Sequence, residues 1–166
     1  MSPNHFRQLR RAYGFDEVAI VPGDVTINPD QVNTEFRIEG LTFPIPIIAS
    51  AMDAVIDVKT AVLISQMGGL GVLHLEGIQT RYDKPEEVLS EIAGAPNSEV
   101  TALLQKIYSR PIQEYLIAER IRAIKNAGAV CAVSVTPANT KSFAPIVSEA
   151  GADILVANTF GGSRSK

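Results

Sequence analysis

The chain has 166 residues, 46% of them hydrophobic, and a formal net charge of −3 at pH 7. This length and composition predict one soluble globular domain that can bury a core. The small acidic excess, with no block of Lys and Arg, argues against nucleic acid or an anionic membrane surface as a partner. No apolar run approaches the ~20 residues of a membrane span and the polar start lacks a signal peptide, so we expect a cytoplasmic protein.

The first 43 residues are expected to form a cap segment that stands apart from the rest. Residues 16–23 predict a strand that ends in a Pro-Gly turn, and residues 35–38 predict another strand. Neither segment belongs to the alternating pattern that begins at residue 44. We therefore expect the two strands to cap a barrel rather than to join its repeat.

Strands and helices alternate from residue 44 onward. The apolar and β-branched run 44–50 predicts a strand buried on both faces, as in a parallel sheet. Residues 57–67 place apolar side chains at helical spacing, with Asp57 as the N-cap and Gly68 as the stop. Further elements are predicted as strands at 70–74, 130–135 and 153–157, and as helices at 112–127 and 145–150, the last opened by Pro145.

Residues 76–110 interrupt this alternation with two helical candidates, 85–93 and 98–108, which predicts an elaborated loop after the second strand. Four such strands make half of a (β/α)₈ TIM barrel, which needs eight strands and ~250 residues to close. We therefore predict an α/β fold with four parallel strands, the N-terminal half of a TIM barrel. Its predicted parts are a cap at 1–43, a half-barrel at 44–157 and an atypical tail at 158–166.

Polar side chains follow the predicted strands at the edge where barrels assemble active sites. Ser50, Met52 and Asp53 supply a hydroxyl, a thioether and a carboxylate, which suits the floor of a nucleotide site. The same pattern also fits a strand end at which Ser and Asp cap a turn. After the next two strands, His74 is a candidate proton shuttle, ligand or polar strand end, and Thr136 is a candidate helix N-cap.

Cys131 is the single cysteine and lies in the apolar run 129–133, which predicts a buried and unreactive thiol. One cysteine excludes an intrachain disulfide and a multi-cysteine metal site, and we predict no metal site. Arg81 and Tyr82 lie on the elaborated loop. They either contact an anionic nucleotide or belong to a solvated loop, and the sequence leaves both readings open.

Three ordered segments carry a resemblance to a known family. Residues 15–23, 47–55 and 68–74 resemble the start of the IMP dehydrogenase and GMP reductase family. Residues 75–82 resemble its IMP dehydrogenase-related branch, which lacks the regulatory CBS pair, and the whole resemblance extends from residue 8 to 156. It implies a (β/α)₈ barrel that moves a hydride between NAD or NADP and C2 of a purine nucleotide, through a covalent cysteine intermediate.

The resemblance also implies roles for particular residues. Ser50 would contact the phosphate end of a bound nucleotide and Met52 its purine ring, whereas Asp53 and His74 would be structural. Thr136 would lie near the cofactor. The expected partners are thus a purine nucleotide, IMP or GMP, and the cofactor NAD or NADP. The choice between IMP oxidation and GMP reduction stays open.

The family residues that perform the chemistry have no counterpart in this sequence. In the family the nucleophilic cysteine follows a sixth strand, the phosphate site comes from the seventh and eighth strands, and an Arg-Tyr flap comes later still. Cys131 cannot replace that cysteine, because Val130 and Ala132 place it within a strand. Asn158 stands where dehydrogenases of the family hold the nicotinamide ribose with an Asp. We therefore predict no catalytic residue, and whether this chain alone is an enzyme stays open.

Three hypotheses follow from this pattern. The first is a truncated or frame-disrupted copy of a purine nucleotide oxidoreductase, inactive alone, because the family pattern ends near residues 157–160. The second is a half-barrel that binds a nucleotide or pairs with itself as a homo-oligomer, since an open sheet leaves unpaired edges. An enzyme of another class has little support, because the sequence assembles no nucleophile with a paired acid and base.

Overall fold

The computed structural model describes residues 11–157; residues 1–10 and the tail 158–166, with Asn158, lie outside the described residues. Contacts between Cα atoms divide the described chain into two compact units, residues 11–33 and residues 34–157. The domain boundaries expected from the sequence, at residues 43 and 157, stay predictions.

The predicted strand at residues 16–23 is wrong. These residues contain no strand, and the regular element described in the first unit is the short 3-10 helix η1, Pro29–Gln31. Ile20 is 100% exposed and Val21 is 81% exposed. A strand is stable only when its backbone groups pair with another strand, and the described part of this unit supplies no partner strand.

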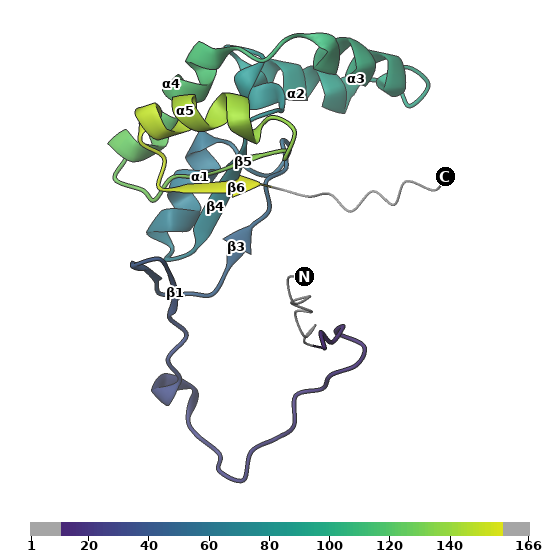
Figure 1. Cartoon of the computed structure of the whole chain (residues 1–166). Helices are drawn as coiled ribbons and strands as arrows, with labels where there is room; N and C mark the ends of the chain where they lie inside the picture. Colours follow the sequence, from purple (N-terminus) through teal and green to yellow (C-terminus); the bar gives the residue numbers. More distant parts are fainter. Residues whose placement is uncertain (1–10, 158–166) are drawn as a thin grey trace, which may run out of the picture. The chain divides into compact units, whose positions relative to one another are not determined.

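The second unit is built on four parallel strands in the order β3-β4-β5-β6 (Figure 1). The strands are β3 Ile48–Ala49, β4 Leu70–His74, β5 Ala132–Val135 and β6 Ile154–Ala157. Each strand lies beside the next one along the chain with at least one helix in the connection, which is the arrangement of a barrel repeat. The four predicted strands are confirmed, although β3 contains 2 residues of the predicted run 44–50.

Three helices cover one face of this sheet, namely α1 Val58–Gln66, α4 Glu114–Asn126 and α5 Thr140–Ala150. The start predicted for α1 is confirmed, because the Asp57 carboxylate accepts a hydrogen bond from the Thr60 N–H at 2.7 Å. Helix α5 ends as predicted at Gly151, whose φ of 88° is the left-handed conformation that favours glycine.

The predicted start of α5 at Pro145 is wrong, because the helix begins at Thr140 and contains Pro145. Hydrogen bonds form the first turn of the helix before Pro145, and the Thr140 hydroxyl donates to the Thr136 carbonyl at 3.0 Å. The Phe143 N–H donates to the Asn139 carbonyl at 3.0 Å. Proline removes one hydrogen bond from the helix, and the packing of Val147 and Ala150 against the sheet offsets this loss.

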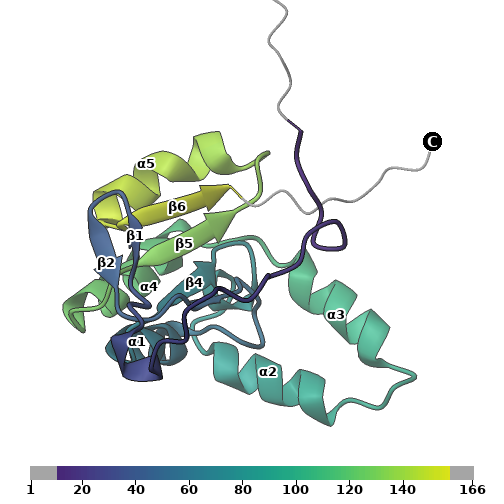
Figure 2. The same cartoon turned by 90° about the horizontal axis from the view of Figure 1, so that it is seen from below.

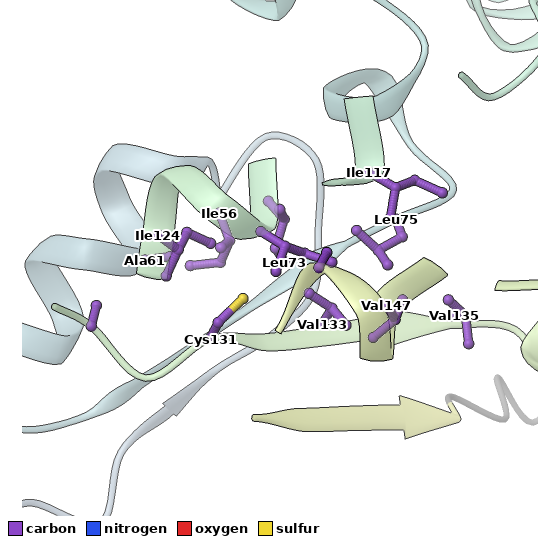
Figure 3. Close-up of a cluster of buried hydrophobic side chains, with 13 residues drawn as sticks. Ile56, Ala61, Leu73, Leu75, Ile117, Ile124, Cys131, Val133, Val135 and Val147 are labelled. Atoms are coloured by element: carbon purple, nitrogen blue, oxygen red, sulfur yellow. The ribbon is translucent and has the colours of Figure 1, made fainter. Parts of the chain in front are cut away.

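The main core lies between the sheet and these helices (Figure 3). Leu73 and Val133 project from the strands toward the predicted apolar stripe of α4, which consists of Ile117, Ile121 and Ile124. All five side chains are 0% exposed. Cys131 lies in the same cluster and is also 0% exposed, so its predicted burial is confirmed. Burial raises the pKa of the Cys131 thiol to about 12, with the nearby Asp153 carboxylate as a further cause, so the thiol is protonated at neutral pH.

A β-hairpin covers part of the opposite face of the sheet. Its strands are β1 Phe36–Ile38, which confirms the predicted strand, and β2 Leu41–Phe43, which the sequence analysis missed. Glu39 and Gly40 form the two-residue turn with φ values of 44° and 92°, the left-handed geometry that such turns require. Phe43 is buried against Leu70, Val72 and Ala132 of the sheet.

The elaborated loop after β4 contains the 3-10 helix η2 Ile78–Thr80 and the two predicted helices, α2 Pro85–Gly94 and α3 Val100–Ser109. Figure 2 shows α2 and α3 as a pair that projects from the side of the sheet. Its small core consists of Ile78, Val88 and Ile107. Among the described residues, no helix has both the length and the apolar content needed to cross a membrane.

The close approach of β4 to α1 yields a first prediction. A Cβ added at Gly71 would lie 2.9 Å from the Ala61 Cα, which is backbone and cannot turn aside. We expect Gly71→Ala to lower the free energy of unfolding by about 1–3 kcal/mol, because overpacking displaces α1. Gly94→Ala is the matched control, since a Cβ there meets nothing within 4 Å. Urea unfolding of both variants tests this, and equal stabilities would contradict it.

Candidate functional site

The candidate site is a pocket of about 470 Å³ toward the carboxyl ends of the four parallel strands. It is lined by residues of all four strands and of the turn that follows β3: Ile48, Ala49, Ser50, Ala51, Met52, Val72, Ser134 and Val156. The walls are mainly apolar with two hydroxyls, the composition that small-molecule sites commonly have. A groove of about 530 Å³ also lies between α2 and α3, but it is remote from the strand ends at which barrels place their sites.

The turn after β3 is held in one conformation by its own backbone. The Met52 N–H donates to the Ser50 carbonyl at 2.9 Å, and the Met52 carbonyl accepts from Val55 at 3.0 Å and from Ile56 at 2.9 Å. Ile56 is 1% exposed and anchors the turn in the main core. Ser50 and Met52, the two predicted substrate-binding residues, therefore lie together in one pocket wall, where Met52 is 50% exposed.

Asp53 ties this turn to the elaborated loop. One oxygen of its carboxylate, Oδ2, accepts from the Ile78 N–H at 3.0 Å and from the Tyr108 hydroxyl at 2.6 Å. Burial, followed by the hydrogen bond to Asp53, raises the pKa of Tyr108 well above its ordinary value. A Cβ at position 77 would overlap Asp53, so glycine there permits this contact. Asp53 thus positions the backbone at Ile78. Tyr108 was not predicted from the sequence, because it lies 55 residues away from Asp53 along the chain.

Arg81 and Tyr82 use their polar groups within the elaborated loop. The Arg81 guanidinium donates to the Glu76 carbonyl at 3.0 Å and 3.3 Å and also to the Arg110 carbonyl. The Tyr82 hydroxyl donates to the Ile107 carbonyl at 3.1 Å. Both side chains therefore hold the ends of the α2–α3 insertion together, a role that neither alternative from the sequence had described, and contact of this pair with a nucleotide stays a prediction.

Glu76 connects the loop after β4 to the loop after β5. Its carboxylate accepts from the Thr136 N–H at 2.5 Å, from the Thr136 hydroxyl at 2.8 Å and from the Asn139 amide at 2.9 Å. Burial alone would raise the pKa of Glu76, but these hydrogen bonds, with a smaller electrostatic contribution from the neighbouring His74, outweigh burial and lower it. Nothing in the sequence pattern had singled out Glu76.

Thr136 forms hydrogen bonds other than those of the helix N-cap predicted from the sequence. Asn139 occupies the N-cap position of α5, so the predicted capping role of Thr136 is wrong. Both Thr136 donors already bind Glu76, which leaves the methyl group and the two acceptor lone pairs of the hydroxyl for any cofactor. A ribose hydroxyl that donates a hydrogen bond fits these remaining groups. The cofactor role of Thr136 stays a prediction.

Two buried polar atoms beside the pocket have no hydrogen-bond partner within the described chain. They are Oγ of Ser134, a residue that is 0% exposed, and Nδ1 of His74. Leaving a buried polar group unpaired costs about 1–3 kcal/mol, so native proteins contain few of them. His74 was a candidate from the sequence but Ser134 was not, because one serine within an apolar strand carries no distinguishing pattern.

A family model described as the IMP dehydrogenase / GMP reductase domain matches residues 12–166. The chain belongs to this family. The resemblance found in the sequence is thereby confirmed. Residues 11–157 contain no cluster of three His, Cys, Asp or Glu side chains that could hold a metal ion.

Similar proteins support the same assignment. An uncharacterized oxidoreductase of Mycolicibacterium smegmatis is 34% identical over 90% of this chain, and the match covers 41% of that protein. An inosine-5′-monophosphate dehydrogenase of Streptococcus pyogenes is 40% identical over 40% of the chain and 14% of that enzyme.

Among solved structures, an IMP dehydrogenase/GMP reductase-like protein of Corynebacterium glutamicum superposes with a TM-score of 0.81 at 30% identity. The match covers 92% of this chain and 42% of that protein. The chain therefore spans about two fifths of the length of these longer relatives. The predicted α/β fold of the TIM-barrel type is confirmed.

The Glu76 contacts generate a pH-dependent prediction. The pKa of Glu76 is lowered in the folded chain, so its carboxylate stabilises the fold above the ordinary glutamate pKa, and this contribution disappears as the pH falls through the folded value. We expect Glu76→Gln to cost about 0.5–1 kcal/mol at pH 7, allowing for solvent screening, and less at pH 3.

Urea unfolding at both pH values measures this difference. Glu91→Gln, which changes an exposed carboxylate on α2, is the matched control and should alter stability little at either pH. A Glu76→Gln deficit that is equal at pH 7 and pH 3 would show that the charge of Glu76 does not stabilise the fold.

Proposed function

We propose that this chain supplies the nucleotide floor of a purine nucleotide oxidoreductase site, at which a hydride moves between NAD or NADP and C2 of IMP or GMP. The observation that carries the proposal is the pocket at the carboxyl ends of the strands, with Ser50 and Met52 in one wall. Membership of the IMP dehydrogenase / GMP reductase family supports a purine nucleotide as the ligand.

The two residues suit different parts of such a ligand. The Ser50 hydroxyl can donate a hydrogen bond to a phosphate oxygen, and a bond to a charged acceptor is stronger than one to a neutral acceptor. The Met52 thioether is exposed, flexible and polarizable, and packs well against the face of an aromatic ring. Phosphate and purine ring are common to IMP and GMP, so the proposal covers both reactions.

The cofactor would lie on the side of the pocket next to Thr136, where the hydroxyl oxygen can accept from a ribose hydroxyl. A bound nicotinamide would supply the hydride acceptor or donor. Cys131 takes no part, because its thiol is buried between sheet and helices and is protonated at neutral pH. By resemblance, the nucleophilic cysteine belongs to a loop after a sixth strand.

Nucleotide binding by this chain tests the proposal. We expect isothermal titration calorimetry to detect IMP, GMP and the nucleoside inosine, with inosine weaker because it lacks the phosphate. Ser50→Ala should weaken IMP and GMP about tenfold and leave inosine unchanged, because it removes a hydrogen bond to the phosphate. Met52→Ala should weaken all three ligands.

Matched controls separate these effects from general damage to the surface. Ser90→Ala removes a hydroxyl that bonds within α2, and Met67→Ala removes a methionine that is 66% exposed at the end of α1. Neither control should change any affinity. Absence of IMP and GMP binding by the unaltered, folded chain would refute the proposed function.

Self-association is a second candidate function, favoured by the exposed edges of the sheet. Ile47 and Ile48 at the β3 edge are 56% and 52% exposed, and Val156 of the outer strand β6 is 37% exposed. Unpaired strand edges with apolar side chains associate readily with a second chain. A homo-oligomer in which two copies pair their edges would cover these residues.

We therefore expect a concentration-dependent dimer in sedimentation velocity. Ile47→Lys should shift the chain toward monomer, because a charged side chain next to the edge strand β3 opposes pairing. Val25→Lys, at a residue that is 78% exposed in the first unit, is the control and should leave the dimer unchanged. A monomer at all concentrations would exclude self-association.

A further inference from the structure

Ser134 and His74 occupy neighbouring positions on the inner face of the sheet. They are directly paired in the register of β4 and β5. His74 lies two residues after Val72 on β4, and Ser134 lies two residues after Ala132 on β5. Val72 and Ala132 both lie on the face of the sheet that packs against the β1–β2 hairpin. Side chains two residues apart along a strand point to the same face. Both polar side chains therefore face away from the helix-covered core; Ser134 lines the strand-end pocket, and His74 lies beside Ser134 on the neighbouring strand.

The Ser134 hydroxyl differs from the other buried hydroxyl with a known environment. Thr80 is also 0% exposed, but its hydroxyl donates to the Leu75 carbonyl at 2.7 Å. Within residues 11–157, Oγ of Ser134 and Nδ1 of His74 have no such partner. A buried polar group that lacks a partner inside the fold is explained most simply by a partner that binds from outside it.

The pocket itself indicates what that partner is. Of the four residues with an unpaired buried polar side-chain atom in the described chain, Ser134 is the one that lines the strand-end pocket. Met52, Val72 and Val156 provide apolar walls, and Ser50 provides the other hydroxyl. A flat heteroaromatic ring satisfies this arrangement, because its faces need apolar contacts and its nitrogen and oxygen edge needs hydrogen bonds.

We propose that Ser134 and His74 form a polar pair that binds the heteroatom edge of a purine base held in the strand-end pocket. This inference rests on the proposed function and adds the residues that recognise the base. The Ser134 hydroxyl both donates and accepts, and the His74 ring nitrogen does either according to its tautomer. Ser50 then meets the phosphate, and the base edge lies against β4 and β5.

Ser134→Ala tests the pair through two readouts with opposite signs. Without ligand, the variant should unfold at the same or a higher temperature, because an unpaired buried hydroxyl is removed. Its affinity for IMP should fall by about fivefold or more, and its affinity for inosine by the same factor, because the base and not the phosphate is affected. Ser50→Ala should weaken IMP alone, which separates the two hydroxyls.

His74→Leu should weaken both ligands in the same way, whereas His74→Asn, which keeps a hydrogen-bonding side chain, should retain most of the affinity. Thr80→Val serves as the matched control. It removes a paired buried hydroxyl, so it should lower the unfolding temperature and leave ligand affinity unchanged.

The outcomes distinguish this inference from the proposed function. If the unaltered chain binds IMP and inosine and Ser134→Ala binds them equally well, the polar pair is refuted and the nucleotide pocket stands. If Ser134→Ala unfolds at a lower temperature, the hydroxyl has a structural partner and the pair is likewise refuted. If the unaltered chain binds neither purine, the proposed function fails and the polar pair fails with it.

Discussion

The parallel pairing of β4 with β5, backed by α4, is the constraint on which the rest of this chain depends. Leu73 and Val133 lie beside each other on adjacent strands and are buried against Ile117 and Ile121. A shift of one residue would turn these side chains to the other face of the sheet, so the register is strongly specified. Because the strands are parallel, this register also brings their carboxyl ends to one edge, where the pocket forms.

Two carboxylates then order the loops above that edge. Asp53 joins the turn after β3 to η2 and α3, and Glu76 joins the loop after β4 to the start of α5. Each replaces several water contacts by charge-assisted hydrogen bonds to backbone or hydroxyl groups. The pocket walls that carry Ser50 and Met52 are therefore held by contacts among neighbouring loops, while the side chains of the walls stay available for a ligand.

Local signals in the sequence predicted most of the second unit correctly. Helix α1 has an N-cap at Asp57, strand β4 is a continuous apolar run, and α4 carries an apolar stripe, so each pattern reports a local preference that packing reinforces. The errors occurred where local preference lacked a partner or was overridden. Residues 16–23 have strand-forming side chains but no described partner strand, and α5 tolerates Pro145 because its other residues pack on the sheet.

The sequence by itself determined the family, the parallel α/β architecture and the location of Ser50 and Met52 at a strand end. These depend on contiguous motifs and on periodicity, which are properties of neighbouring residues. Only the tertiary structure brought Tyr108 to Asp53 and Thr136 to Glu76. Only it showed that Ser134 is buried beside His74 and that its hydroxyl has no hydrogen-bond partner within residues 11–157. Such relations join residues far apart along the chain, and they exist only after strand register and loop packing have placed the side chains in space.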